Sequence, residues 1–271
     1  MENIASLVRS RRSVRTFDER VLTRQDLNQL CDFMSAIDNP YGIPIKFKVL
    51  NAAEQKLGCP VVVGTDLFIG AKMKRSPNFN EAFGYSFEKL VLYAQSLGIG
   101  TVWIGGTMDR KAFEKAMELA EDEVMPCISP IGYPAAKMSL RESMMRKGVK
   151  ANERLPFEKV FFDGSFDTPL AQERAGKLND CLEAVRLAPS AVNKQPWRVV
   201  LANHATHFYL MRSKGFRTGV IDMQKIDIGI AMCHFDLMAK EAGLAVRFVR
   251  NSPDIKPMNG EEYIASFEFD I

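Results

Sequence analysis

The first residues with evident chemistry form the run Arg11-Arg12-Ser13-Val14-Arg15 near the amino terminus. Three guanidinium groups and one hydroxyl lie within five residues, a combination that suits a doubly charged phosphate. Arginine binds phosphate oxygens in pairs, and the backbone amides of a turn add further donors. The alternative is a solvated run of charges, and this run alone does not separate the two interpretations.

A second group of polar residues lies at positions 189–197, between a predicted apolar helix and a predicted strand. Ser190, Asn193 and Gln195 offer hydrogen-bond donors and acceptors two or three residues apart. A turn can direct all three side chains at the edge of a planar heterocycle. The alternative is a structural turn, in which these residues cap a helix and Trp197 belongs to the core.

Two further segments are weaker candidates. Residues 98–106 contain four glycines, but a long predicted helix precedes them and the spacing is not that of a dinucleotide-binding loop. The pair Gly105-Gly106 would let the backbone approach a flat ligand, or would simply follow the end of a strand. Residues 137–154 carry six Lys or Arg and two Glu, which indicates another phosphate contact or a solvated surface.

The overall composition excludes several classes of protein. The 271 residues are 46% hydrophobic and 25% charged, as in ordinary globular proteins. A formal net charge of +3 is too small for a general nucleic-acid-binding protein. No apolar run reaches the roughly 18 residues that span a bilayer, and no apolar segment follows the first arginines. We therefore expect a cytoplasmic protein that binds neither nucleic acid nor membrane.

The cysteines and histidines do not indicate a metal site. The five cysteines are far apart, at positions 31, 59, 127, 181 and 233, and form no C-x-x-C pair. His204 and His207 form an H-x-x-H pair without a third ligand nearby. We therefore expect free thiols and no bound metal.

The predicted elements mix helices and strands along the whole chain. Helices are expected at 2–10, 23–37, 81–97, 110–120, 178–187 and 226–242. Strands are expected at 47–50, 60–64, 101–104, 127–131, 197–201, 207–211, 244–249 and 263–269. The most linker-like stretch is 162–169, which contains Gly, Asp and Pro and divides the chain into a longer and a shorter part.

The two parts share a weak internal repeat. A shift of 145 positions aligns Gly84 with Gly229, each within a long predicted helix. The same shift aligns Gly98 with Gly243, each directly after that helix. Each part contains a helix, a turn, a strand, a long helix, a glycine and a strand, in that order. The repeat predicts two half-units, residues 1–163 and 164–271, packed as one globule that forms an internal pseudo-dimer.

Together these patterns resemble the FMN-dependent nitroreductase superfamily over nearly the whole chain. The family's R-R-S-x-R start lies at 11–15, its G-I-G-x-x-W-I-G-G segment at 98–106 and its I-G-Y-P sequence at 131–134. Its P-S-x-x-N-x-Q-P-W turn lies at 189–197, where six fixed positions agree. Because the arginine motif and this turn lie in different halves, the sequence is similar to the TM-nitroreductase branch, in which two half-units are fused in one chain.

The resemblance implies an α+β fold, with a central, mostly antiparallel sheet flanked by helices. It implies that Arg11, Arg12, Ser13 and Arg15 bind the FMN phosphate, with a further contact from Arg154. The ring and ribityl chain would be bound by the turn and the glycine segment, namely Pro189, Ser190, Ala191, Asn193, Trp103, Ile104, Gly105 and Gly106. Gln195 would belong to the cofactor site as a support of the turn. The alternative is that Gln195 and Trp197 have only a structural role in the turn.

The implied activity is oxidation of NAD(P)H, a transient donor, by bound FMN and reduction of a nitroaromatic or quinone-type acceptor in ping-pong order. No side chain is required as a catalytic acid or base. Other flavin reactions on the same fold remain open, such as reductive dehalogenation or flavin breakdown. A non-catalytic flavin-binding protein and a relative that has lost its cofactor remain open as well.

The repeat also predicts one FMN per chain. Under a shift of 151, residues 11–15 align with residues 162–166, which contain no cation. Under the shift of 145, Gly105-Gly106 aligns with Arg250-Asn251, so the second potential site lacks its ligand residues. We therefore expect a monomer that acts as a pseudo-dimer, with a small-molecule electron acceptor as its partner.

Overall fold

The computed structural model describes residue 1 and residues 3–269, which group into two compact units. The first unit contains Ser10–Phe79 and Ser86–Lys150, and the second contains residues 3–9, Asn80–Tyr85 and residues 151–269. Residues 2, 270 and 271, which fall within the predicted helix 2–10 and the predicted half-unit 164–271, lie outside the described residues. The division of the chain into half-units after residue 163 stays a prediction.

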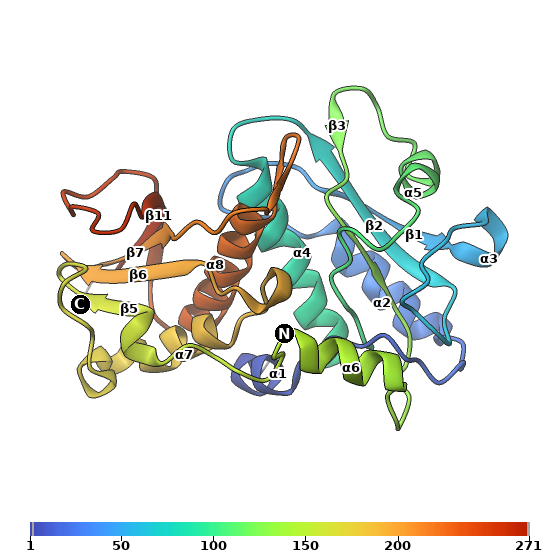
Figure 1. The fold of residues 1–271 in the computed structure, drawn as a ribbon, viewed down its shortest axis with the longest axis horizontal. Helices are drawn as coiled ribbons and strands as arrows, with labels where there is room; N and C mark the ends of the chain where they lie inside the picture. Colours follow the sequence, from blue (N-terminus) through green and yellow to red (C-terminus); the bar gives the residue numbers. More distant parts are fainter. Residues whose placement is uncertain (2, 270–271) are drawn as a thin grey trace. The chain divides into compact units, whose positions relative to one another are not determined.

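The first unit is built on an antiparallel sheet. Strand β2 (Leu67–Lys74) pairs with β1 (Lys46–Asn51), β3 (Glu123–Val124) and β4 (Ile128–Pro130). Side chains of β1, β2, β4 and a neighbouring helix, among them Leu50, Phe68, Ile128 and Phe113, form a buried apolar core. The helices of this unit are α2 (Arg24–Ser35), α3 (Ala52–Gln55), α5 (Arg110–Ala116), α6 (Leu140–Gly148) and most of α4 (Phe79–Ser96) (Figure 1).

The second unit is built on a five-stranded sheet. Its strand order is β10 (Val246–Val249), β11 (Glu262–Phe269), β7 (Ala205–Leu210), β6 (Trp197–Ala202) and β5 (Phe161–Asp163). Neighbouring strands are antiparallel except β5 and β6. Strands β8 (Arg217–Thr218) and β9 (Ile221–Asp222) form a separate ribbon. The helices are α1 (Ile4–Ser10), α7 (Asn179–Leu187) and α8 (Met223–Glu241), with short 3₁₀ segments η1 (Phe157–Lys159), η2 (Gln172–Leu178) and η3 (Ala191–Asn193).

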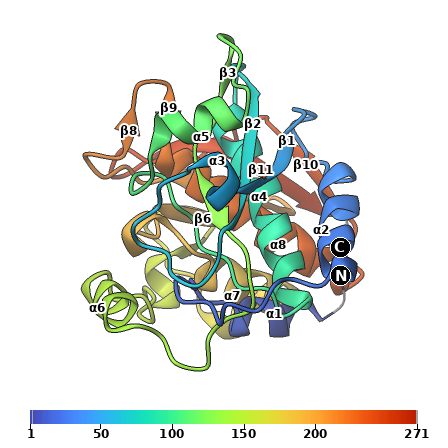
Figure 2. The same cartoon turned by 90° about the vertical axis from the view of Figure 1, so that its right-hand side faces the viewer.

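Helix α8 is the buried centre of the second unit, because all of its residues from 226 to 239 are buried and most of them are apolar. The first turns of α4 lie beside it (Figures 1 and 2). Glycines allow this approach: a Cβ on Gly84 would lie 2.0 Å from the carbonyl oxygen of Ile226, and a Cβ on Gly229 would lie 2.1 Å from that of Glu81. The two backbones are therefore in direct contact at a position where no side chain fits.

Most of the predicted elements are confirmed, with ends that differ by a few residues. Thr23 caps α2 by accepting a hydrogen bond from the backbone N–H of Asp26 at 3.1 Å, as the capping pattern predicts. The predicted helices 81–97, 178–187 and 226–242 correspond to α4, α7 and α8. The predicted hairpin at 197–211 corresponds to β6 and β7.

Two of the predicted strands are wrong. Residues 60–64 form no strand, because Gly64 adopts φ +87° and only Val63 joins an isolated bridge; the strand is β2, which the sequence analysis missed. Residues 101–104 also form only isolated bridges. The linker-like stretch 162–169 is folded, because β5 pairs with β6 and Phe166 is buried against Tyr209.

Within the described residues, no helix has both the length and the apolar character needed to cross a bilayer. The same residues contain no group of three or more His, Cys, Asp or Glu side chains able to hold a metal ion. All five cysteines are free thiols, and Cys127, Cys181 and Cys233 are buried.

We predict that Gly229→Ala destabilises the protein, because the new Cβ would collide with the backbone of α4. Such overpacking costs about 1–3 kcal/mol or more of unfolding free energy, measured by chemical denaturation. Gly148→Ala is the control, since Gly148 ends a helix and a Cβ there would meet nothing within 4 Å. Equal stability of the two variants would contradict the close contact between α4 and α8.

Candidate functional site

The arginine run of the first unit, residues 11–15, lies along the glycine segment, residues 98–106. The backbone N–H of Val14 donates to the carbonyl of Thr101 at 2.9 Å, and Ser13 pairs with Thr101 in a parallel bridge. Gly100 allows this approach, because a Cβ there would lie 2.9 Å from that of Val14. The structure therefore brings together two segments that were selected separately from the sequence, residues 11–15 and 98–106.

Arg11 is nearly buried, with a side chain 7% exposed. Burial lowers the pKa of its guanidinium, the nearby carboxylate of Glu88 opposes that shift, and the positive charge of Arg146 adds to it. Glu88 is fully buried and its Oε1 lies 3.9 Å from Arg11 Nε. That Nε atom is buried and has no hydrogen-bond partner among the described residues.

Arg12 is held by a second buried carboxylate. Glu142 lies in the first turn of α6, where Ser139 accepts a hydrogen bond from its backbone N–H at 3.2 Å. Its Oε1 accepts from Arg12 Nη1 at 3.1 Å, and its Oε2 accepts from the backbone N–H of Arg15 at 3.0 Å. One glutamate therefore fixes both a side chain and the backbone of the arginine run.

Arg15 completes the cationic group. Burial lowers the pKa of Arg15, Glu142 opposes that shift, and Arg146 of α6 lowers it further. Its Nε is also buried without a hydrogen-bond partner among the described residues. We define Arg11, Arg15 and Arg146, with Glu88 and Glu142, as the arginine cluster. Its three cations exceed its two carboxylates, and two buried Nε–H groups lack an acceptor, so it is suited to bind an anion.

The glycine segment is fixed by side chains from the same unit. Trp103 donates from Nε1 to Glu88 Oε2 at 2.9 Å, so the carboxylate beside Arg11 also holds this segment. Ile104 exchanges backbone hydrogen bonds of 3.0 Å with Ile128 of β4. Arg110 donates from Nη2 to the carbonyl of Gly105 at 2.6 Å. Gly106 is exposed, and a Cβ there would meet nothing within 4 Å.

The polar turn, residues 189–197, lies in the second unit, and its backbone is strained. Val192, Asn193 and Gln195 have φ of 44°, 59° and 48°, the left-handed region that residues other than glycine rarely adopt. A β-branched residue such as Val192 is a pronounced outlier there. Each such residue costs on the order of 1–3 kcal/mol and persists only when its surroundings hold it.

The polar side chains of the turn hydrogen-bond the turn itself. Ser190 Oγ accepts from the backbone N–H of Gln195 at 2.8 Å. Gln195 is 5% exposed; its Oε1 accepts from the backbone N–H of Leu155 at 2.8 Å, and its Nε2 donates to the carbonyl of Asn193 at 3.1 Å. The interpretation of Gln195 as a support of the turn agrees with these contacts. Trp197 is fully buried, as the core interpretation expects.

Arg154 and Asn193 connect the turn to the preceding segment. Asn193 donates from Nδ2 to the carbonyl of Glu153 at 3.0 Å and accepts at Oδ1 from Arg154 Nη1 at 3.3 Å. Arg154 also donates from Nη2 to the carbonyl of Leu187 at 3.1 Å. The guanidinium of Arg154 therefore supports the turn within the second unit, and a phosphate contact from it stays a prediction.

Four residues of the first unit were not selected from the sequence as site residues: Glu88, Arg110, Glu142 and Arg146. Ser139 and Glu142 form an S-x-x-E capping pattern, which could have predicted the start of α6. Arg146 lies in the basic stretch, where only Arg154 was selected. No local pattern marks Arg110, and none marks Glu88, whose partners Arg11 and Trp103 are distant in the sequence.

Comparison with known proteins places the chain in a family. Residues 3–239 match the model of a protein family described as "Putative TM nitroreductase". No curated protein matches the sequence.

Several solved structures are similar to the chain. A nitroreductase from Thermotoga maritima has 19% identity and a TM-score of 0.62, with 98% of this chain and 93% of that chain covered. A nitroreductase family protein from Clostridium novyi NT has 18% identity and a TM-score of 0.44, with 49% and 86% covered. An FMN-dependent nitroreductase from Clostridium difficile R20291 has 18% identity and a TM-score of 0.41, with 52% of this chain and 94% of that chain covered.

The first of these similarities confirms the predicted fold class. The chain has an α+β, nitroreductase-like fold, in which mostly antiparallel sheets are flanked by helices. The described strands form one sheet in each unit and a small ribbon, where the sequence analysis expected a single central sheet. The internal pseudo-dimer stays a prediction.

We predict that Glu142→Ala destabilises the first unit, because it leaves Arg12 and the backbone N–H of Arg15 without their acceptor. The expected loss is about 1–3 kcal/mol of unfolding free energy, measured by chemical denaturation. Glu121→Ala, which removes an exposed glutamate, is the control and should change stability by less than about 0.5 kcal/mol. A Glu142 variant as stable as the control would show that this carboxylate does not hold the arginine run.

Proposed function

The chain belongs to the family described as "Putative TM nitroreductase", and we propose on this basis that it is an FMN-dependent oxidoreductase. In the proposed reaction, NAD(P)H is the donor and a nitroaromatic or quinone-type compound is the acceptor. The observation that carries the proposal is the arginine cluster, in which Arg11 and Arg15 each present a buried Nε–H without a hydrogen-bond partner in the described part of the chain.

The phosphate of FMN fits the chemistry of this cluster. A phosphate monoester carries close to two negative charges at neutral pH, and its oxygens accept several hydrogen bonds. Arg11 and Arg15 each present a buried Nε–H without an acceptor among the described residues. Binding the phosphate would satisfy these donors and reduce the repulsion that Arg146 adds to both guanidiniums. Ser13, between them in sequence, would add a hydroxyl.

The ring and ribityl chain of FMN are assigned to the polar turn and the glycine segment, as the family resemblance implies. In the turn, Ser190 and Gln195 are engaged with the backbone, while the side chain of Val192 is 54% exposed. We therefore assign the contacts of this turn to its backbone groups and to Val192. In the glycine segment, exposed Gly106 would offer its backbone without a side chain in the way.

When bound, FMN would supply the hydride- and electron-transfer chemistry of the reaction. The residues of the chain bind and orient it, and the proposal assigns no proton transfer to a side chain. The positive cluster also favours cofactor forms that carry more negative charge. We further propose one FMN per chain, a monomer as the acting unit and a cytoplasmic location.

The function is tested by an absorption spectrum of the purified protein, taken before and after reconstitution with FMN. Anaerobic addition of NADH or NADPH should then bleach the flavin band within the time of mixing and measurement. A bound flavin that stays oxidised would instead support a non-catalytic flavin-binding protein. Protein that remains colourless after reconstitution would contradict the cofactor assignment.

We predict that Arg15→Ala weakens FMN binding about tenfold to a hundredfold. The lost contact is a charge-assisted hydrogen bond, which contributes roughly 1.5–3 kcal/mol. Equilibrium titration by flavin fluorescence measures the dissociation constant. Arg24→Ala, which removes an exposed arginine at the start of α2, is the matched control. If both variants bind FMN like the natural chain, the arginine cluster does not bind the phosphate.

A further inference from the structure

Helix α8 carries a buried carboxyl group that accepts a hydrogen bond from the polar turn. Asp227 is 2% exposed, and its Oδ1 accepts a hydrogen bond from the backbone N–H of Ala191 at 3.0 Å. Its Oδ2 is buried as well and has no hydrogen-bond partner among the described residues. Ala191 is the residue immediately before Val192, the most strained position of the turn, with φ 44° and ψ 33°.

The surroundings of this carboxyl group disfavour its charged form. Burial raises the pKa of Asp227 well above its usual range, and the negative charge of Asp222 raises it further, while the hydrogen bond from Ala191 opposes the shift. A neutral carboxyl group still accepts a hydrogen bond through its carbonyl oxygen. An asparagine has nearly the same shape and the same carbonyl acceptor, so it can replace Asp227 in this contact.

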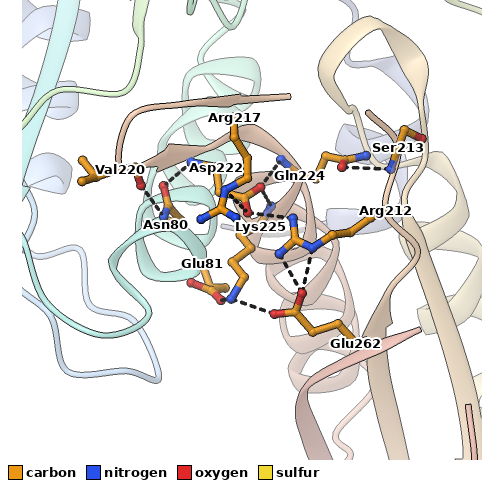
Figure 3. A network of polar contacts seen from close by, with 10 residues as sticks. All are labelled: Asn80, Glu81, Arg212, Ser213, Arg217, Val220, Asp222, Gln224, Lys225 and Glu262. Atoms are coloured by element: carbon orange, nitrogen blue, oxygen red, sulfur yellow. Dashed lines mark hydrogen bonds and ion pairs between the residues drawn. The ribbon is translucent and has the colours of Figure 1, made fainter. Parts of the chain in front are cut away.

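The start of α8 is fixed by a network of polar contacts (Figure 3). Asp222 caps the helix by accepting from the backbone N–H groups of Gln224 and Lys225 at 3.2 and 3.3 Å. Asp222 also accepts from Arg212 Nη1 at 2.8 Å, and its own backbone N–H donates to Asn80 Oδ1 at 3.1 Å. The network therefore attaches α8 to the first turn of α4 and to the segment after β7.

The network is extended by ion pairs around the same helix end. Arg212 also pairs with Glu262 of β11 at 2.7 Å, and Lys225 pairs with Glu262 at 2.9 Å and with Glu81 at 3.4 Å (Figure 3). Glu81 and Asp222 are buried, so the ion pairs that these two carboxylates form are weakly screened by solvent. The first turn of α8 is thus held from three elements, and Asp227 follows within the next turn.

We propose that Asp227 is a positioning residue, which transmits the fixed position of α8 to the polar turn and holds its left-handed backbone through Ala191. The inference rests on the proposed function, since the turn is assigned to bind the flavin. Strained turns persist only when their surroundings hold them, and the hydrogen bond from Ala191 to Asp227 connects this turn to α8. Asp227 does not touch the reacting atoms in this assignment.

The first test compares two substitutions of Asp227. Asp227→Ala removes the acceptor for Ala191 and should weaken FMN binding at least tenfold in a flavin-fluorescence titration. Asp227→Asn restores the acceptor and should bind FMN within about threefold of the natural chain. Asp227→Leu, which has a similar volume without an acceptor, should behave like the alanine variant and is used if that variant does not fold. Loss of binding in Asp227→Asn as well would overturn the role of this hydrogen-bond acceptor.

The second test asks whether Asp227 acts on the strain of the turn. Glycine adopts the left-handed conformation without a steric cost, so Val192→Gly should reduce the need for Asp227. In a double-mutant cycle, Asp227→Ala should lower the midpoint of chemical denaturation clearly less in the Val192→Gly background than in the natural chain. An equal loss in both backgrounds would overturn the proposal, because the two residues would then be independent.

The two tests separate the inference from the function on which it rests. If the natural chain binds no FMN, the proposed function fails, while the denaturation cycle still decides whether Asp227 holds the turn. If the chain binds FMN and the cycle shows no coupling, the function stands and the positioning role fails.

Discussion

The burial of guanidinium groups is the constraint around which the first unit is organised. A buried cation is stable only beside an anion or enough acceptors, and here Glu88 and Glu142 supply the anions. Glu88 belongs to α4 and Glu142 to α6. The arginine run and these two helices therefore stabilise each other's positions. Glu88 also holds Trp103, and the glycine segment therefore depends on the same buried charge.

In the polar turn of the second unit, the polar side chains stabilise the backbone. These side chains look like ligands in the sequence, but Ser190, Asn193 and Gln195 hydrogen-bond to nearby backbone. The backbone they stabilise is one that Val192 would not adopt on its own. The specificity of the P-S-x-x-N-x-Q pattern is then explained by the conformation of the turn, with ligand contacts coming from what that conformation exposes. Asp227 belongs to the same support, although it lies far away in the sequence.

The sequence predicts local features well and long-range partners poorly. The cap at Thr23 and the apolar run of α8 depend on neighbouring residues, and both were correctly located. Strand β2 was missed, because its alternation is weak and Gly70 lies within it, packed against Met117. The arginine run and the turn were recognised as site candidates. Glu142 was not, since its partner Arg12 is 130 residues away and no local pattern encodes that contact.

The arginine cluster is proposed to bind the phosphate of a flavin cofactor. The most direct measurement is the ratio of the dissociation constants of the natural chain for FMN and for riboflavin, which lacks the phosphate, titrated under the same salt conditions. Two or more charge-assisted contacts predict that FMN binds at least about a hundredfold more tightly. Equal affinity for the two flavins would contradict the assignment of the cluster.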